Sequence, residues 1–411
     1  MHPRSPYHYT LPVTIQHSLS LGLVPENPST YQTHAYDVII IGASIAGCMS
    51  ALELANKGWR VAVLEKRQSL QAYKKICTHI IHPYAVNKLK EFGVLETLLN
   101  ESAQMTAMNI HHQDLSVLFP FKGKLDAANI ERSDLDPALR ATLLNHKNIT
   151  LFMGFRIQSF IKSGKRVSGI RASTLDNELM SFRAPLVIGA DGRNSEVTKL
   201  ANGTIKKTDN ERIALFSYFS TGTKLTQSHV WSLRQGQEYI GLFPNRQRIL
   251  ISWYLPRHEY ESKQETHEQS FKRLINFIAK QGINVGDQLE SIIVVKDSSP
   301  QSVRLRLNAL ALVGDTKLTA DPLTGIGCTW AMQSAKLLSV CLGKPPSSKQ
   351  HPFIRSISIQ TRLNLYSASH ILLFKFTSAF MTFVSMHGKW VFNKPVYRFL
   401  AWCTGKRKPN Q

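Results

Sequence analysis

The sequence is short of cysteines, of acidic side chains and of long apolar runs, and each shortage limits what the protein can be. Its five cysteines lie far apart, without a CxxC pair and without histidines at zinc-site spacing: Cys48, Cys77, Cys328, Cys341 and Cys403. This usage argues against a structural metal and against disulfide-reductase chemistry, and it is typical of a reducing compartment. We therefore expect no metal site and a cytoplasmic location.

Acidic side chains number 28 against 50 basic ones, which gives a formal net charge of +22. No Asp or Glu follows Asp321, whereas twelve Lys and Arg residues do. An acid-free basic region suits an anionic membrane surface or a nucleic acid, and it also fits a basic surface that has no partner. Because neither a zinc pattern nor a basic and aromatic alternation is present, we expect no nucleic acid partner.

The longest apolar stretch, residues 371–386, has sixteen residues and falls short of the roughly 20 that span a membrane. Its polar residues recur at steps of three and four, which indicates an amphipathic helix. Two roles fit residues 371–411: peripheral contact with a membrane, or a helix that closes the core. At the other end, residues 1–35 lack a basic start and an apolar core, so we expect a polar leader and no signal peptide.

A strand, glycine turn, helix and strand follow one another from residue 36 to residue 66. YDVIII (36–41) and RVAVLEK (60–66) are typical of buried strands, and residues 46–57 are typical of a helix. The turn GASIAG (42–47) keeps the outer glycines of the dinucleotide fingerprint, but Ser44 stands at the middle glycine. Glu65 ends the second strand, where an acidic side chain would meet a ribose hydroxyl. An ordinary glycine turn is the alternative.

Further elements can be expected from the patterns downstream. Residues 82–99 have helical spacing, and 131–144 begin as a helix in which Ser133 and Asp136 come close to a capping box. Four strand candidates lie between 211 and 256, a helix at about 268–280 and a strand at about 290–297. Two more buried strands are expected, one that ends within 187–191 and one that ends within 310–315. A helix is expected to begin near Gly327.

Three segments now stand in order: GASIAG with Glu65, VIGADGRNS (187–195) and ALVGDTKLTADPLTGIGCTWAMQSA (311–335). Together they resemble the aromatic-hydroxylase class of flavoprotein monooxygenases. They also resemble the wider superfamily with flavin halogenases and prenyl-lipid (geranylgeranyl) reductases. The resemblance covers residues 36–345 and implies FAD as the cofactor.

The resemblance also implies which residues bind FAD. They are Gly42, Ser44, Ile45, Ala46, Gly47, Glu65, Lys66, Arg67, Arg132, Asp191, Gly192, Gly314, Asp315, Pro322, Gly325, Gly327 and Cys328. In the family the Asp191 and Gly192 equivalents lie near the pyrophosphate, and the Asp315 equivalent bonds the ribityl chain. The segment from Pro322 to Gly327 would wrap the edge of the isoalloxazine ring. Plain structural roles are the alternatives: Asp191 would cap a turn after its strand, and Arg132 would be a lone arginine without a cofactor contact.

The chain departs from the family at several positions. Lys317 and Leu318 stand where the family commonly has GDAAH, and Thr329 and Ser334 replace an asparagine and an aspartate. We therefore expect an altered environment around the flavin.

The expected fold is α/β with two lobes: a Rossmann-like FAD-binding domain, an inserted β-sheet substrate domain and a helical C-terminal tail. The FAD-binding domain would comprise 36–205, with small substrate-lobe strands near 106–121, and 301–345. The substrate domain would take 206–300, and the basic apolar region 346–411.

The resemblance implies an NAD(P)H-driven monooxygenase that inserts oxygen into a hydrophobic small molecule through a flavin peroxide adduct. Since no second glycine fingerprint follows, NAD(P)H would dock transiently. Substrate contacts are expected from Tyr239, Phe243 and Trp253. His79 and His82 are the candidate acids or bases, and histidines fixed in the core are the alternative.

Three other functions fit in part. A prenyl-lipid reductase carries Y x W x F P, which YIGLFP (239–244) matches except that Gly241 replaces the tryptophan. A flavin halogenase would carry a pair of tryptophans, of which only Trp253 is present. A flavin-fold protein that binds a partner without catalysis, as the Rab GDP-dissociation inhibitors do, is the non-enzymatic alternative.

Overall fold

The computed structural model describes residues 34–370 apart from short gaps. The gaps are 113–114, 120–125, 208–211, 223–224, 234–237, 247, 263–264, 320–321, 323–324, 348–350, 352–353 and 355. Most of the expected leader and the whole tail at 371–411 lie outside the described residues. Within this described part, no helix is long and apolar enough to cross a bilayer.

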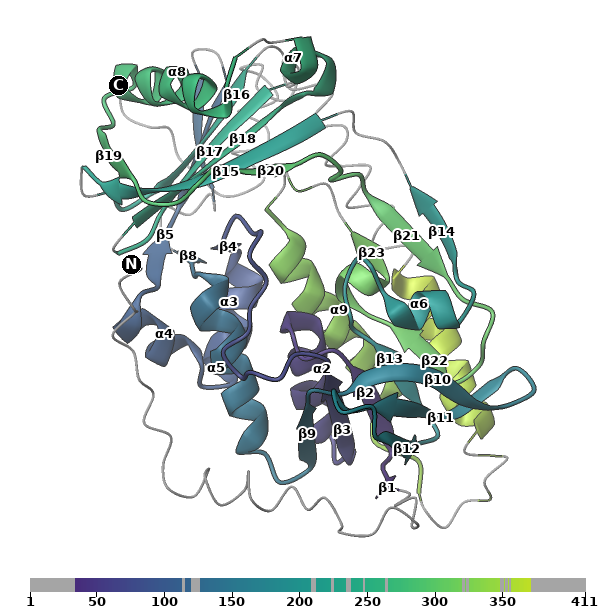
Figure 1. Cartoon of the computed structure of the whole chain (residues 1–411). Coiled ribbons are helices and arrows are strands. Elements are labelled where there is room, and N and C mark those ends of the chain that lie inside the picture. The colour runs from purple at the N-terminus through teal and green to yellow at the C-terminus, as the bar shows by residue number, and fades with distance from the viewer. Residues whose placement is uncertain are drawn as a thin grey trace.

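A five-stranded parallel sheet forms the centre of the lower lobe in Figure 1, in the order β22-β13-β2-β3-β9. Its strands are β2 (Val38–Ile41), β3 (Val61–Glu65), β9 (Ile149–Met153), β13 (Val187–Gly189) and β22 (Leu310–Leu312). β2 pairs with β3 on one side and β13 on the other. The three motifs follow β2, β13 and β22, so they meet at one carboxyl edge of this sheet, where α/β folds bind ligands.

Both faces of this sheet are covered, which explains why β2 reads as a continuous apolar run. Val38 and Ile40 share a core with residues of α2 (Ile45–Ala55), α5 (Arg132–Leu144) and α9 (Gly327–Leu342). Ile39 and Ile41 pack on the opposite side, against an antiparallel sheet. That second sheet holds β10 (Arg156–Ser163), β11 (Arg166–Ser173) and β12 (Leu179–Arg183), with β1 (His34–Ala35) parallel to β12.

The upper lobe in Figure 1 is a large, mostly antiparallel sheet. Its strands are β19 (Val285–Gln288), β15 (Arg212–Thr221), β18 (Arg248–Pro256), β17 (Glu238–Pro244), β16 (Ser228–Leu233), β6 (Met108–His112) and β7 (Leu115–Phe119), with β20 (Ile293–Val295) also on β15. The helix α8 (His267–Lys280) covers the face that points away from the lower lobe, and α7 (Arg257–Ser262) follows β18. On the inner face Phe216, Phe243 and Tyr254 pack with Ile80 of the lower lobe.

The remaining elements connect the lobes. Two small sheets are formed by β4 (Ile80–Ile81), β8 (Ala127–Asn129) and β5 (Gln104–Thr106), and by β14 (Thr204–Lys207), β21 (Gln301–Arg304) and β23 (Leu318–Thr319). The helices are α3 (Pro83–Glu91), α4 (Leu95–Glu101), α6 (Glu196–Leu200) and the 3-10 helix η2 (Gly314–Thr316).

The predicted α/β fold with a second, β-sheet lobe is confirmed. Two local expectations change. The helical pattern at 82–99 divides into α3 and α4, because Gly93 adopts a φ of 71°. The capping box at Ser133 is wrong: Glu131 is the N-cap of α5, no side chain caps the helix, and Asp136 binds Arg132 instead.

Part of the region predicted as the C-terminal tail belongs to the core. Residues 356–370 are helical, and Ile359, Leu363 and Tyr366 pack in the same apolar core as α2 and α9. The Tyr366 hydroxyl donates a 2.8 Å hydrogen bond to the carbonyl of Leu312. The chain therefore returns to β22 before the tail begins.

Candidate active site

The glycine turn after β2 is built so that only glycine fits at its two ends. Gly42 has a φ of 107°, and a Cβ there would lie 2.4 Å from the carbonyl oxygen of Ala190. A Cβ on Gly47 would lie 1.8 Å from the carbonyl oxygen of Gly42. The outer glycines thus allow α2 to start directly on β2 and allow β13 to approach the turn.

The helix α2 begins at this turn with Ile45 and Ala46, which are buried. Its N-cap, Ser44, makes no side-chain bond to the first-turn amides, and no acidic residue stands in the first turn. The positive end of the helix dipole is therefore uncompensated, which favours an anionic group at this point.

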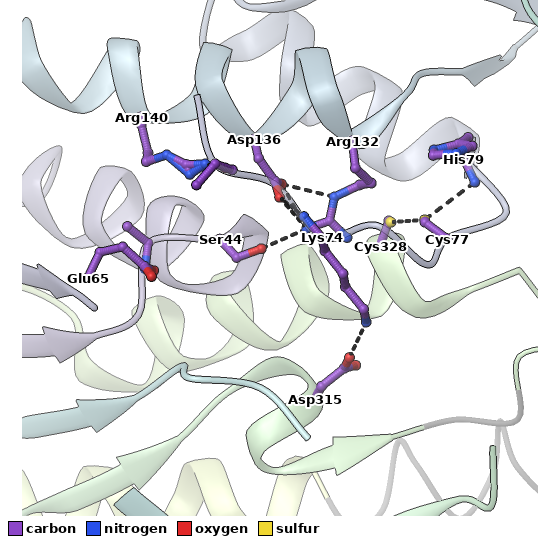
Figure 2. Close-up of polar contacts among 12 residues, drawn as sticks. Ser44, Glu65, Lys74, Cys77, His79, Arg132, Asp136, Arg140, Asp315 and Cys328 are labelled. Atoms are coloured by element: carbon purple, nitrogen blue, oxygen red, sulfur yellow. Dashed lines mark hydrogen bonds and ion pairs between the residues drawn. The ribbon is translucent and has the colours of Figure 1, made fainter. Parts of the chain in front are cut away.

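Ser44 instead contacts a buried ion pair from α5 (Figure 2). Arg132 donates through Nη2 to the hydroxyl of Ser44 at 2.7 Å and to both carboxylate oxygens of Asp136 at 2.7 and 2.9 Å. Arg132 is 4% exposed and Asp136 is fully buried. Burial disfavours the charge on Arg132, but the Asp136 carboxylate and its hydrogen bond, together with Cys328 and Cys77, outweigh burial and raise the pKa of Arg132. A permanent cation therefore stands beside the turn.

Glu65 fixes the turn from β3. Its carboxylate accepts hydrogen bonds from the backbone N–H of Ala43 at 2.8 Å and of Arg67 at 3.0 Å. Lys66, next to it, is exposed, and Arg67 is half-buried. The carboxylate lies at the position expected for a ribose partner, and it also orients the loop that starts there.

The second motif joins the third through Asp191. Its carboxylate accepts hydrogen bonds from the hydroxyls of Ser195 at 2.6 Å and Thr316 at 3.3 Å. The backbone N–H of Gly192 donates to the Thr316 hydroxyl at 2.7 Å. Burial raises the pKa of Asp191, and the bond from Ser195 acts against that rise. Asp191 thus connects the end of β13 to α6 and η2.

The third motif contacts the first through Gly314, where a Cβ would lie 2.6 Å from the Cβ of Ala46. Its N–H donates to the hydroxyl of Ser334 at 2.9 Å, so the serine that departs from the family pattern anchors η2 to α9. Lys317, another departure, donates to the carbonyl of Val303 at 2.8 Å. Its ammonium therefore points to β21.

Asp315 lies beyond the carboxyl end of β22, at the space outside this edge of the central sheet, which we call the crevice. It pairs with Lys74, Nζ to Oδ2, at 2.9 Å (Figure 2). The carboxylate raises the pKa of Lys74. The side chain of Lys74 is 49% exposed, so this is a partly solvated contact. Lys74 comes from the segment between β3 and β4, which crosses the mouth of the site.

The start of α9 forms the wall opposite the turn. Gly325 has a φ of 58°, and a Cβ there would lie 2.6 Å from Cγ2 of Ile80, whereas a Cβ on Gly327 would meet no atom within 4 Å. Among the residues described, α9 has neither a side-chain cap nor an acid in its first turn. Cys328, the second residue of α9, places its Sγ 3.6 Å from Sγ of Cys77.

The two candidate histidines lie on the strip between this wall and the large sheet. His79 has a φ of 62°, and its Nε2 bonds the hydroxyl of Tyr218, while its buried Nδ1 makes no hydrogen bond with any described residue. Tyr218 in turn carries the guanidinium of Arg248 4.0 Å above its ring. His82 is the N-cap of α3, and its N–H donates to the hydroxyl of Thr329 at 3.3 Å.

An apolar pocket opens where the lower lobe meets the inner face of the large sheet. Its lining residues are Thr78, Ile80, Met108, Val230, Tyr239, Gly241, Phe243, Ser252, Tyr254, Pro322 and Gly325. Tyr239 and Phe243, two expected substrate contacts, line it together with Pro322 and Gly325, two expected flavin contacts. Trp253 does not line it. Residues alternate along β18, so Trp253 faces α8 and donates to Glu238 at 2.7 Å.

These features fit a dinucleotide with a planar ring system. Two uncapped helix starts and a buried arginine converge on one crevice, and open space beside Gly192 and Gly327 leaves room for a ligand. Residues 35–348 match the family model described as FAD binding domain. The chain belongs to this family. FAD is therefore the cofactor of the fold, and the resemblance stated from the three motifs is confirmed.

Relatives fall into several classes of this superfamily. The chain is 25% identical over 319 residues to 6-methylpretetramide 4-monooxygenase of Streptomyces rimosus, covering 73% of each chain. It is 24% identical over 319 residues to digeranylgeranylglycerophospholipid reductase 1 of Methanococcoides burtonii, covering 73% of this chain and 72% of the relative. Among solved structures, the flavin-dependent brominase Bmp2 matches with a TM-score of 0.72 at 14% identity, over 90% of this chain and 93% of that one. The predicted class, an FAD-dependent oxidoreductase, is confirmed.

The sequence reading missed several residues of the crevice. Asp136 stands four residues after Arg132 on a helix, a spacing that indicates an ion pair and could have revealed it. Lys74 and Thr316 had no such signal, because each acts on a partner more than 100 residues away.

Proposed function

We propose that this FAD-dependent oxidoreductase is a monooxygenase, driven by NAD(P)H, that acts on a hydrophobic small molecule. The pocket carries the proposal. Pro322 and Gly325 line one side of it, and residues of the large sheet, among them the aromatic side chains of Tyr239, Phe243 and Tyr254, line the other. A substrate held there would lie beside the flavin ring edge and away from bulk water.

The chain's own residues bind and orient the cofactor. The first-turn amides of α2 would hold the pyrophosphate, and Asp315 would accept a hydrogen bond from the ribityl chain. The amides at the start of α9 would favour negative charge on the ring. When bound, FAD supplies the redox and oxygen chemistry.

Reduction by NAD(P)H would occur at the same crevice. Arg132 is buried and paired within the protein, so the transient docking of a second nucleotide would use exposed cations at the mouth of the site. Lys66, exposed on the segment after β3, would offer its ammonium to the phosphates, and so would Lys74, whose ion pair with Asp315 is partly solvated.

A prenyl-lipid reductase is the second candidate. It is favoured by the archaeal reductase among the relatives and by Tyr239, Phe243 and Pro244 on one strand of the pocket wall. Against it, a Cβ on Gly241 would lie 2.6 Å both from the Phe243 ring and from Oγ of Ser252. The tryptophan of the reductase pattern therefore does not fit here without rearrangement of the wall.

The decisive experiment measures NAD(P)H oxidation by the FAD-loaded protein with and without oxygen, over a panel of aromatic, polyketide and isoprenoid compounds. We expect substrate-stimulated oxidation that requires oxygen, with ¹⁸O from ¹⁸O₂ in the product. Anaerobic turnover that saturates a double bond would instead establish the reductase. If no compound stimulates NAD(P)H oxidation under either condition, both functions are wrong.

A further inference from the structure

Cys77 and Cys328 are separated by 251 positions in the sequence, and the fold brings their sulfur atoms to 3.6 Å (Figure 2). Cys328 belongs to the first turn of α9, the wall expected to face the flavin ring. Cys77 belongs to the segment from Lys66 to His82, which crosses the mouth of the crevice. A disulfide has a sulfur separation of about 2.05 Å, so the pair needs only a small approach to be joined.

The environment distinguishes the two thiols. The Cys328 thiol and the N–H of His79, at 3.3 Å, both bond Sγ of Cys77, and Arg132 lies nearby. These bonds lower the pKa of Cys77 and raise that of Cys328. Cys77, whose sulfur accepts the N–H of His79, is therefore the better placed to attack, and Cys328 is the partner that resolves.

The other described cysteines offer no such pair. Cys48 lies fully buried in α2, and Cys341 lies near the far end of α9. Within the described residues, the 3.6 Å contact is the one sulfur pair at hydrogen-bonding distance.

We propose that Cys77 and Cys328 form a reversible disulfide when the protein meets a peroxide, and that this bond fastens the segment 66–82 to α9 across the FAD crevice. The Cys77 thiolate attacks one peroxide oxygen and breaks the O–O bond, which gives a sulfenic acid and hydroxide, and the hydroxide takes up the proton that the Cys77 thiol lost on ionisation to give the first water. The Cys328 thiol then attacks that sulfur and releases water. Two thiols and one hydrogen peroxide thus become one disulfide and two waters, and a dithiol reverses the change.

The cellular source of peroxide rests on the proposed function, because reduced flavin that meets oxygen without substrate yields hydrogen peroxide. The thiol chemistry itself needs only the two cysteines and added peroxide. A transient, redox-sensing disulfide is also the kind that occurs in reducing compartments. Because Lys74 and Cys77 share the segment that runs from Asp136 of α5 to Asp315, closing the bond would restrain that segment at the mouth of the crevice.

The test uses the full-length, FAD-loaded protein, reduced, desalted and treated with one equivalent of hydrogen peroxide. Free thiols are then blocked and the chain is digested with trypsin. We expect a linked pair of the peptides Ile76–Lys88 and Leu318–Lys336, abolished by dithiothreitol. We also expect bound FAD to exchange with free FAD at least about fivefold more slowly in the oxidised form, since the cross-link limits opening of the crevice.

Cys77→Ser and Cys328→Ser should each lose the linked peptide and the change in exchange, whereas Cys341→Ser should retain both. The peptide measurement on the unaltered chain does not depend on whether the two serine variants fold. If peroxide leaves both thiols open to alkylation, oxidises Cys77 to the sulfinic acid, or links it to another cysteine, the proposal is overturned. An absence of NAD(P)H turnover would overturn the proposed function and leave this result standing.

Discussion

Single residues at the crevice are fixed by charge pairing in places where water is excluded. Arg132 and Asp136 share two hydrogen bonds from one guanidinium nitrogen, with Ser44 as a third partner. Removing one partner of a buried pair leaves an uncompensated charge and costs about 3–5 kcal/mol. Such a pair therefore keeps the cation beside the turn whether or not a ligand is bound.

The Asp315 carboxylate gives a prediction at this scale. Asp315→Ala should weaken FAD binding at least about tenfold, because it removes a charged hydrogen-bond acceptor for the ribityl chain. Lys74→Ala is the matched control: it breaks the same 2.9 Å ion pair but keeps the acceptor, and FAD affinity should stay within about threefold. Both dissociation constants can be measured from flavin fluorescence quenching. An equal loss in the two variants would mean that the ion pair, and not the acceptor, holds the cofactor.

At the scale of elements, the turn between β2 and α2 and the start of α9 use glycine for different reasons. Gly47 has no space for a Cβ because the carbonyl of Gly42 lies against it, while Gly327 has open space on its Cβ side. Gly47 is therefore required by the packing of the protein itself. Gly327 is required only by the ligand that occupies the space beside it.

Two alanine variants separate these roles. Gly47→Ala should destabilise the cofactor-free protein by at least about 2 kcal/mol, because α2 must move off β2. Gly327→Ala should leave that stability within about 0.5 kcal/mol and lower FAD affinity about tenfold, because the methyl group enters the crevice. Urea unfolding of the apoprotein and flavin titration measure the two effects. If the Gly327→Ala variant binds FAD normally, the flavin ring does not lie beside Gly327.

At the scale of the whole molecule, the helical residues 356–370 belong to the core of the lower lobe. Tyr366 is buried, and His370 packs against the ring of Trp330 at 5.5 Å between ring centroids. A deletion meant to remove only the basic apolar tail must therefore begin after His370.

We expect a chain of residues 1–370 to fold and bind FAD but to lose affinity for anionic vesicles at least about tenfold, since seven Lys and Arg residues follow His370. Co-sedimentation with phosphatidylserine vesicles measures this, with phosphatidylcholine vesicles as the neutral control. A chain that ends at residue 345 should unfold, because it loses Tyr366 and its bond to Leu312. If the chain of 1–370 is insoluble or free of flavin, the tail closes the core and is not a membrane contact.

The sequence by itself determined the central sheet, the order of the three motifs and the cofactor class. These follow from local signals: apolar strands covered on both faces, glycines at positions that admit no side chain, and acids at strand ends. Trp253 could not be placed in this way, because neighbouring residues of β18 point alternately to the pocket and to α8, and local patterns do not say which residue points where.

Only the tertiary structure decided which distant side chains meet. The five cysteines lie far apart in the sequence, yet the sulfur atoms of Cys77 and Cys328 are in contact at the mouth of the crevice. Lys74 reaches Asp315 across 241 positions, and Thr316 reaches Asp191 across 125. Local patterns fix how each segment folds, but contacts between segments depend on how whole sheets and helices pack, and no spacing along the chain records that packing.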